Sequence, residues 1–275
     1  MSGKLWVVGT PIGNLSDFSP RAAEALAGAD FIAAEDTRVT LKLLNHFGIR
    51  KPLVSYYEHN KRERGELICS RILAGETCAL VSDAGMPAIS DPGELLVAQC
   101  AELGIPVLAV PGPSAVITAL AVSGLPTGRF TFEGFLSVNK KSRRAHLEEL
   151  KNEKRTMVFY EAPHKLPGTL KDLAEAFGDR RVALARELTK IHEEVIRTTL
   201  LQAACQYENG GAKGEFVLVV EGAPQMEQKQ DFLLADAVAI AQNLMADGMS
   251  AAAAAKLAAQ ESGFKKGDIY RAISR

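Results

Sequence analysis

The first half of the chain repeats one pattern, in which a short apolar run is followed by a loop of small or polar residues. The apolar runs are 5–8, 31–34, 78–81 and 107–110. Amphipathic stretches separate them, and this alternation predicts βαβ units with a parallel sheet. Ligands bind beyond the carboxyl ends of the strands in such sheets. The four loops are therefore the first candidates for a functional site.

The helices between these strands have marked ends. Ser19 is a suitable N-cap, and Pro20 fits the first helical position. Two further helices are expected at 60–75 and 91–104, each ending at a glycine. These helices supply the crossover connections that parallel strands require.

A second region follows, in which the apolar runs lie closer together. The runs are 130–132, 156–160, 182–185, 194–198 and 215–221. Several of them leave no room for a helix in between, which predicts a mixed or antiparallel sheet. We therefore expect an α/β fold with two domains, 1–123 and 124–224, that meet at a cleft.

The last part of the chain has the spacing of helices. Residues 225–231 have the character of a linker, and residues 232–275 predict short helices with tight turns. Ser250 is expected to cap an alanine-rich helix that ends at Gly263, and Asp268 to open a last helix. This small C-terminal helical module is either helix-turn-helix-like or a packing appendage, and the sequence leaves both open.

Composition and cysteine spacing limit the function classes. The net charge is −1, so no overall positive field attracts nucleic acid, and local basic patches must do so. The four cysteines are scattered without a CxxC, which predicts neither a metal site nor a disulfide framework and favours a cytoplasmic protein. The uncharged stretch 103–128 is broken by prolines and glycines, so we expect a buried strand, turn and helix there and not a membrane span.

Two of the four loops lack charged residues. The loop at 9–14, GTPIGN, is not GxGxxG, and no GxxxxGK[ST] occurs in the chain. The usual cradles for phosphates are therefore missing, and a cofactor without phosphates fits better. The loop at 111–115, PGPSA, precedes a helix whose free N–H groups can bind a carboxylate or a ring nitrogen.

The other two loops carry carboxylates. In the segment 35–38, EDTR, Asp36 or Thr37 either caps the following helix or contributes to a site. In the segment 82–93, SDAGMPAISDPG, Asp91 is accounted for as a helix start. Asp83 is not, because it follows a strand and precedes no regular helix. We expect Asp83 to bond a ligand hydroxyl or amine.

These segments occur in one order with FEGFL (132–136), YEAPH (160–164), ARELTK (185–190) and GE…VEG (214–222). The set closely resembles the ribosomal RNA small subunit methyltransferase I family, within the tetrapyrrole methylase superfamily, over nearly the whole chain. The resemblance implies a two-domain tetrapyrrole-methylase-like fold, S-adenosylmethionine in the interdomain cleft and a homodimer. It also implies 2′-O-methylation of a cytidine in the decoding region of 16S ribosomal RNA.

The resemblance also implies which residues hold the cofactor. By motif position they are Pro11, Ile12, Asp83, Gly85, Ser114, Ala115, Glu161 and Leu188. Met86 stands where the family pattern has threonine. A methionine can still pack against an adenosine, so this departure leaves the expected function in place.

Methyl transfer from a sulfonium is an in-line displacement, and a positioned base helps a ribose hydroxyl to attack. The expected catalytic residues are Asp36, Arg38, Glu161 and Lys190, with His164 and Glu187 close to them in the same motifs. A lysine beside a carboxylate either has a lowered pKa once desolvated or steadies the forming alkoxide. The alternative for Lys190 is an exposed pair at a strand end.

A dense basic segment follows the FEGFL motif. Its cations are Lys140, Lys141, Arg143 and Arg144, and we expect them at the exposed start of a helix. Cations at that end oppose the helix dipole, so helix stability does not explain them. Contact with RNA phosphates does, although a charge run can also be only a solvated face.

Two other functions compete with this interpretation. The first is a small-molecule methylase that acts on a tetrapyrrole, against which the basic segment and the EDTR motif argue. The second is a non-enzymatic nucleic-acid-binding regulator that uses the C-terminal helices. Such a helix should be rich in Arg, Asn or Gln, whereas 251–260 offers only Lys256 and Gln260.

Overall fold

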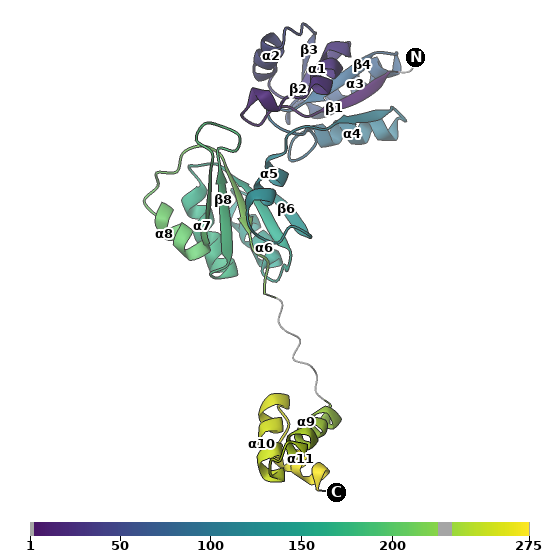
Figure 1. Ribbon diagram of the computed structural model, residues 1–275. Coiled ribbons are helices and arrows are strands. Elements are labelled where there is room, and N and C mark those ends of the chain that lie inside the picture. The colour runs from purple at the N-terminus through teal and green to yellow at the C-terminus, as the bar shows by residue number, and fades with distance from the viewer. Residues whose placement is uncertain (1–2, 225–232, 275) are drawn as a thin grey trace. The chain divides into compact units, whose positions relative to one another are not determined.

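The computed structural model describes residues 3–224 and 233–274. The chain divides into two compact units, 1–223 and 224–275. Figure 1 shows two sheets within the first unit and a group of helices that forms the second. The predicted linker, 225–231, lies outside the described residues.

The first sheet is fully parallel, with the strand order β3-β2-β4-β1-β5. Its strands are β1 (Lys4–Val8), β2 (Phe31–Ala34), β3 (Leu53–Ser55), β4 (Thr77–Val81) and β5 (Val107–Val110). The four strands expected from the sequence are confirmed. The short edge strand β3 was not expected, because three residues after Pro52 are too few to show an alternating pattern.

Helices connect the strands, as the βαβ pattern predicted, and they cover both faces of this sheet. They are α1 (Pro20–Gly28), α2 (Thr37–His46), α3 (Lys61–Leu73) and α4 (Gly93–Glu102), with a short 3-10 turn η1 (Leu15–Asp17) before α1. Side chains of α1 and α2 share one apolar core with the sheet, and those of α3 and α4 share another. Ser19 caps α1 by accepting a hydrogen bond from the Ala22 N–H (3.1 Å), as expected.

The second sheet is mixed, as expected, with the order β6-β7-β10-β8-β9. The strands β6 and β7 are parallel, and the other pairs are antiparallel. The strands are β6 (Phe130–Phe135), β7 (Thr156–Glu161), β8 (Arg181–Arg186), β9 (Glu194–Thr199) and β10 (Phe216–Val220). All five expected runs are therefore strands.

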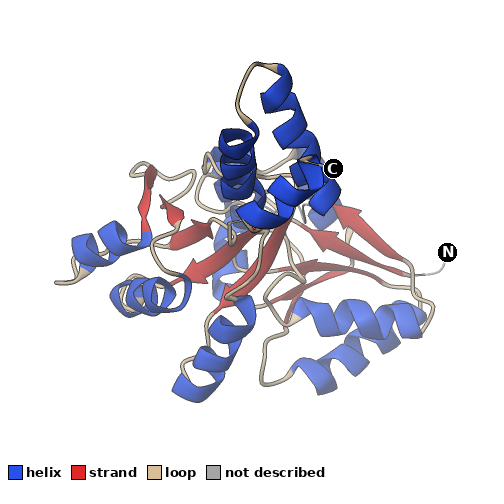
Figure 2. Ribbon diagram, turned by 90° about the horizontal axis from the view of Figure 1, so that it is seen from below, coloured by secondary structure: helices blue, strands red, loops and turns tan. Residues whose placement is uncertain are grey.

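The second sheet also has helices on both faces (Figure 2). One face packs against α6 (Lys140–Leu150), α7 (Leu166–Phe177) and α8 (Leu200–Tyr207). The other face packs against α5 (Ala115–Val122), which leaves the first sheet after β5. Because α5 starts at the loop after β5 and packs on the second sheet, it joins the two halves of this unit.

The C-terminal unit consists, in its described part, of α9 (Leu234–Ala246), α10 (Ala251–Ser262) and α11 (Lys266–Ile273) around an alanine-rich core. Gly263 ends α10 in the left-handed region (φ 78°), as expected. The expectation for Asp268 is corrected, because α11 begins at Lys266 and Asp268 lies within its first turn. No described helix is long and apolar enough to cross a membrane.

Candidate active site

A cavity of about 630 Å³ lies where the loops of the first sheet face the second sheet. The loops after β1, β2, β4 and β5 supply one wall, and β6, β7, β8 and β10 with their adjoining loops supply the other. The expected cofactor-binding residues that line it are Ile12, Asp83, Gly85, Ser114, Ala115, Glu161 and Leu188. Pro11 alone of that set does not.

Close backbone contacts hold the loops around the cavity. Thr10 and Gly85 form an isolated bridge, and their backbone N–H and C=O groups bond in both directions (2.9 and 3.2 Å). Gly85 has a φ of +84°, which favours glycine. A Cβ on Gly9 would lie 2.6 Å from the Cα of Gly112, so the loops after β1 and β5 meet at a distance that only glycine permits.

The charged residues that line the cavity are acidic. The lining includes five carboxylate side chains and, among the described residues that form it, no lysine or arginine. The carboxylates are those of Glu35, Asp83, Asp91, Glu161 and Glu215. Partial burial raises the pKa of Glu35 above its ordinary value, and the nearby charges of Asp83 and Asp91 add to that shift. The cavity therefore favours a ligand that brings positive charge or hydrogen-bond donors.

The two acids of the EDTR segment have different roles, since Glu35 lines the cavity and Asp36 caps α2. Asp36 caps α2 and accepts hydrogen bonds from the Arg38 backbone N–H (2.8 Å) and from its guanidinium (3.0 and 2.6 Å). These bonds lower the pKa of Asp36 to about 2. The Arg38 side chain is 87% exposed, and neither Asp36 nor Arg38 lines the cavity. Glu35, which sequence reasoning did not select, does line it.

Asp83, in the loop after β4, is hydrogen-bonded to the loop after β2. Its Oδ1 accepts a hydrogen bond from the backbone N–H of Asp36 (3.0 Å). Partial burial raises the pKa of Asp83, and the charge on Asp36 adds to that effect. Asp83 is exposed towards the cavity and caps no helix, so it remains available to a ligand.

Glu161 is the only one of the expected catalytic residues that lines the cavity, and its side chain is held by hydrogen bonds. It is 3% exposed, and its Oε1 accepts from the Ala162 N–H (2.9 Å). The Thr169 hydroxyl donates to its other oxygen, and Arg143 Nη2 donates to the Thr169 oxygen (2.9 Å). Arg143 also pairs with Asp172 (2.5 Å). A residue of the basic segment is thus connected to the cavity through one hydroxyl.

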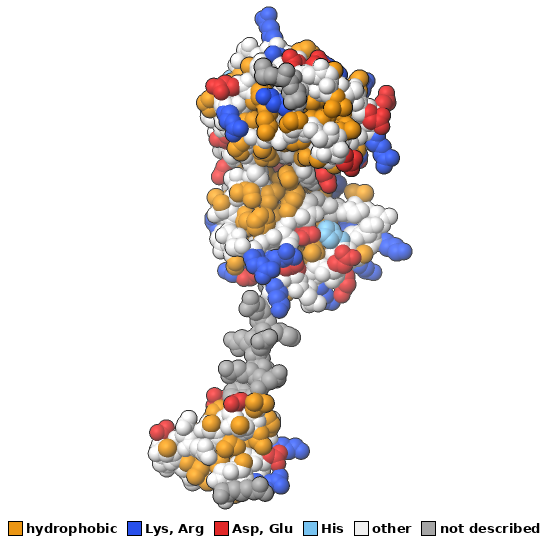
Figure 3. All heavy atoms as spheres, turned by 90° about the vertical axis from the view of Figure 1, so that its right-hand side faces the viewer, with side chains coloured by type: hydrophobic (Ala, Val, Ile, Leu, Met, Phe, Trp, Pro, Cys, Tyr) orange, Lys and Arg blue, Asp and Glu red, His pale blue; other side chains and the backbone are white. Residues whose placement is uncertain are grey.

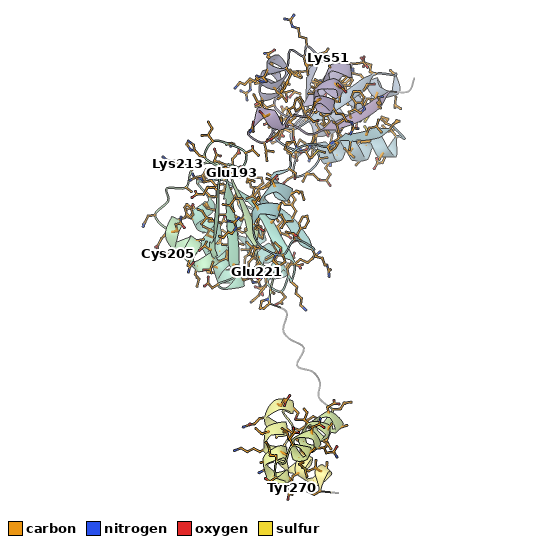
Figure 4. The ribbon with its side chains drawn as sticks, viewed as in Figure 1. Lys51, Glu193, Cys205, Lys213, Glu221 and Tyr270 are labelled. Carbon is orange, nitrogen blue, oxygen red and sulfur yellow. The ribbon has the colours of Figure 1, made fainter. Side chains whose placement is uncertain are left out.

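Lys190 is held by two carboxylates, Glu187 (2.8 Å) and Glu215 (2.9 Å). Burial disfavours its charge, but the two carboxylates outweigh that effect and raise its pKa. Of the two alternatives for Lys190, the lowered pKa is therefore wrong, and Lys190 stays protonated. Its loop is shaped by Glu193, which accepts a hydrogen bond from the Thr189 N–H (2.6 Å) and is labelled in Figure 4.

The basic segment begins a helix, as expected. Asn139 caps α6 by accepting from the N–H groups of Lys141 (3.0 Å) and Ser142 (3.1 Å). Lys140, Lys141 and Arg144 are exposed, and none of them forms an ion pair with another described residue. Arg143 differs, because its guanidinium is mostly buried against α7. This difference could not be predicted from the local sequence, since the partners of Arg143 lie more than twenty residues away.

Aromatic and imidazole side chains of the second half also reach the cavity. Phe135, Tyr160 and His164 line it, and only His164 was considered from the sequence. A signal for the other two was present, since Tyr160 ends an expected strand and Phe135 lies in the FEGFL motif that follows another. In the part of the chain that the structure describes, no three His, Cys, Asp or Glu side chains are grouped as metal ligands.

The comparisons with known proteins agree on one family. The family model described as Tetrapyrrole (Corrin/Porphyrin) Methylases matches residues 4–204. A protein of Halalkalibacterium halodurans, named Ribosomal RNA small subunit methyltransferase I, is 48% identical over 98% of this chain and 93% of its own length. A protein of the same name from Escherichia coli O157:H7 is 44% identical over 98% of this chain and 94% of its own length.

Solved structures resemble the chain in fold. The methyltransferase CobJ has a TM-score of 0.60 at 21% identity and matches 81% of this chain and 95% of its own. A uroporphyrin-III C-methyltransferase from Thermus thermophilus, complexed with S-adenosylhomocysteine, has a TM-score of 0.53 at 17% identity. That match covers 80% of this chain and 92% of the other. At these identities the likeness concerns the fold alone.

Proposed function

The chain belongs to the tetrapyrrole methylases and, among them, to the ribosomal RNA small subunit methyltransferase I family, and from that premise we propose that it is an S-adenosylmethionine-dependent RNA methyltransferase. Its substrate is 16S ribosomal RNA in the small subunit, and the acceptor is the ribose 2′-hydroxyl of a cytidine in the decoding region. The observation that carries the proposal is the acidic cavity beside a cationic helix start.

The lining of the cavity suits this cofactor. S-adenosylmethionine carries positive charge on its sulfonium and its ammonium group, and five carboxylates face the cavity. Asp83 and Glu161 stand on opposite walls and can accept hydrogen bonds from hydroxyl and amine groups. The start of α5, at Ser114 and Ala115, offers N–H groups to a carboxylate. Ile12, Gly85 and Leu188 complete the lining of the proposed cofactor site, and Pro11, which does not line the cavity, precedes Ile12 in the same loop.

The same lining argues against a small-molecule substrate of the tetrapyrrole type. A tetrapyrrole with carboxylate side chains would meet Glu35 and Asp91, which are only partly exposed, in the cavity. Like charges at short range in a low-dielectric site cost several kcal/mol, at about 4 kcal/mol for one pair at 4 Å. An RNA ribose avoids this repulsion, because its phosphates can remain outside.

When bound, the cofactor supplies an electrophilic methyl group for in-line attack. The chain must orient the ribose hydroxyl, exclude water and accept one proton. Glu35 is the better proton acceptor, because its raised pKa brings its proton affinity closer to neutral pH. Glu161 is held by Thr169 and Ala162, which suits it to orienting the hydroxyl. Both carboxylates line the cavity from opposite walls.

The other expected catalytic residues do not line the cavity and act through residues that do. Asp36 and Arg38 are tied together outside the cavity, and Asp36 reaches it only through its N–H bond to Asp83. Lys190 holds the side chain of Glu215, which lines the cavity. We therefore assign Asp36, Arg38 and Lys190 positioning roles in this proposal.

Three exposed cations supply the RNA contact. Lys140, Lys141 and Arg144 stand at the start of α6, where they oppose the helix dipole and pair with no described acid. With a net charge of −1, the chain has no general attraction to RNA, so the contact must be local. Arg143 forms an ion pair with Asp172, so it helps to fix the start of α6 and is not a free cation of this surface.

A homodimer in the cytoplasm completes the proposal. Figure 3 shows hydrophobic side chains gathered on one face of the first unit, and exposed apolar residues include Leu108 on β5 and Ile117 on α5. Such surface is typical of protein–protein contact. The cysteines of the chain are free thiols, which fits a reducing compartment.

Paired methylation assays test the proposal. The purified chain is incubated with radiolabelled S-adenosylmethionine and either small ribosomal subunits that lack the modification or a porphyrinogen. We expect close to one methyl group per small subunit and none on the porphyrinogen. Label on the porphyrinogen and not on RNA would establish the small-molecule alternative.

A further inference from the structure

Phe135 is an exposed aromatic side chain on the wall of the cavity. It is 57% exposed, whereas the other phenylalanines of the two sheets are buried or half-buried. Fully wetting an aromatic ring forgoes the 1.5–3 kcal/mol that burial of such a side chain typically provides, so about half of that is forgone here. An exposed apolar ring on the wall of this cavity has a surface suited to a flat, uncharged partner.

A β-bulge puts the ring there. Phe132 pairs with Val158, Gly134 with Phe159 and Phe135 with Tyr160, so Glu133 is an extra residue in β6. Side chains alternate between the faces of a strand, and without the extra residue position 135 would face the core under α6 and α7. The bulge moves Phe135 to the face of Tyr160, which is the cavity face.

Gly134 makes the bulge possible. Its φ is +62°, a conformation that favours glycine. A Cβ there would lie 3.4 Å from the Ser90 hydroxyl, in the loop that belongs to the opposite wall. The bulge therefore stands close to the first half of the unit, and Phe135 lies where the two walls approach each other.

One side of the ring is supported and the rest is open. The centroids of Phe135 and Tyr160 are 5.4 Å apart with their planes tilted by 57°, and Phe132 packs against Tyr160 from the other side (5.0 Å). These contacts restrict the ring without covering it. A rigid, partly open ring is what a stacking site for a nucleobase requires.

We infer that Phe135 is the stacking platform for the base of the target nucleotide, which leaves its RNA stack when the ribose enters the cavity. The inference rests on the proposed function. The phosphate contacts support it, because Lys140 follows Phe135 by five residues, a span of at most about 18 Å. One RNA strand can therefore reach the ring with a base and the start of α6 with its phosphates.

The test compares three replacements of Phe135 in the full chain. Phe135→Ala removes the ring, Phe135→Leu keeps apolar bulk without an aromatic face, and Phe135→Trp keeps a stacking surface. Loss of one base–aromatic stack should lower kcat/KM for small subunits by about 10- to 100-fold in the alanine and leucine variants. The tryptophan variant should stay within about threefold of the unaltered chain.

Two controls separate stacking from other roles. Leu73→Ala removes an exposed apolar side chain at the end of α3. This position precedes the start of β4, whereas the cavity lies beyond the ends of the strands, so kcat/KM should be unchanged. S-adenosylmethionine affinity and Tm should be unchanged in all variants. Because Phe135 is more than half exposed, its loss should not unfold the chain.

Three outcomes would overturn the inference. Full activity of Phe135→Ala or of Phe135→Leu would show that no base stacks on the ring. A parallel loss of S-adenosylmethionine affinity would make Phe135 part of the cofactor site. An unaltered chain that fails to methylate small subunits at all would overturn the proposed function itself, which is a separate and recognisable result.

Discussion

Neutralising the exposed cations at the start of α6 should weaken RNA binding without weakening the fold. The variant replaces Lys140, Lys141 and Arg144 by alanine and keeps Arg143. The three replaced side chains are exposed and unpaired among the described residues, and cations at a helix start are unfavourable by a few tenths of a kcal/mol. We therefore expect Tm to stay level or to rise slightly.

The size of the RNA effect follows from counterion release. Each lost phosphate contact reduces the slope of log affinity against log salt by about 0.7 to 0.9. Three contacts therefore reduce it by about 2 to 3. Between 50 and 200 mM salt, the apparent KM should rise more steeply for the unaltered chain than for the variant. The fold increase in KM for the unaltered chain should be about 15 to 40 times the fold increase for the variant.

The assay is the initial rate of methyl transfer to small subunits at several salt concentrations, with S-adenosylmethionine affinity as a second readout. Arg143→Ala is the matched control, because it removes one cation of the same segment. It also breaks the bonds to Asp172 and Thr169, so it should lower Tm, at a cost of about 1–3 kcal/mol for hydrogen bonds to charged groups. Equal salt slopes for the triple variant and the unaltered chain would refute the phosphate contacts.

The remaining predictions concern the cavity. S-adenosylmethionine should bind in the presence of a chelator, as titration calorimetry can show, and a requirement for a divalent ion would contradict the proposed site. Asp83→Asn should weaken cofactor affinity and leave Tm nearly unchanged, since the amide oxygen of asparagine can still accept the N–H bond from Asp36. Glu35 has a raised pKa, and a cationic ligand favours its charged form, so cofactor affinity should fall as the pH drops through a window above 4.5. Glu35→Gln should flatten that profile, and an unchanged profile would exclude Glu35. Thr169→Val removes a donor to Glu161 and should lower kcat by about 10-fold with cofactor affinity retained, whereas an unchanged kcat would leave that hydrogen bond without a role in orientation.

The elements of the fold were largely predictable from local patterns. Apolar runs with turn residues at both ends identified nine of the ten strands that the structure describes, and the N-cap at Ser19 and the C-terminal Gly263 were confirmed. The missed strand, Leu53–Ser55, is too short to show a period. Hydrophobic patterning carries this information because it reflects which face of each element is buried.

Residues of the site could be predicted from the sequence only where their place depends on their position along a strand. Which acid of the EDTR segment faces the cavity depends on where β2 ends, and the sequence favoured Asp36 over Glu35. The different roles of Arg143 and its neighbours depend on Asp172, a contact between two helices. The place of Phe135 depends on one extra residue in β6. Such tertiary pairings leave no local period in the sequence.

In the proposed function, this cavity directs a methyl group onto a ribose oxygen of small-subunit RNA. The most direct test treats unmodified small subunits with the chain and S-adenosylmethionine, digests the RNA to nucleosides and separates them by mass spectrometry. We expect a single new product, 2′-O-methylcytidine, from one position in the decoding region. A methyl group on a base, on another nucleoside or at many positions would contradict the proposed function.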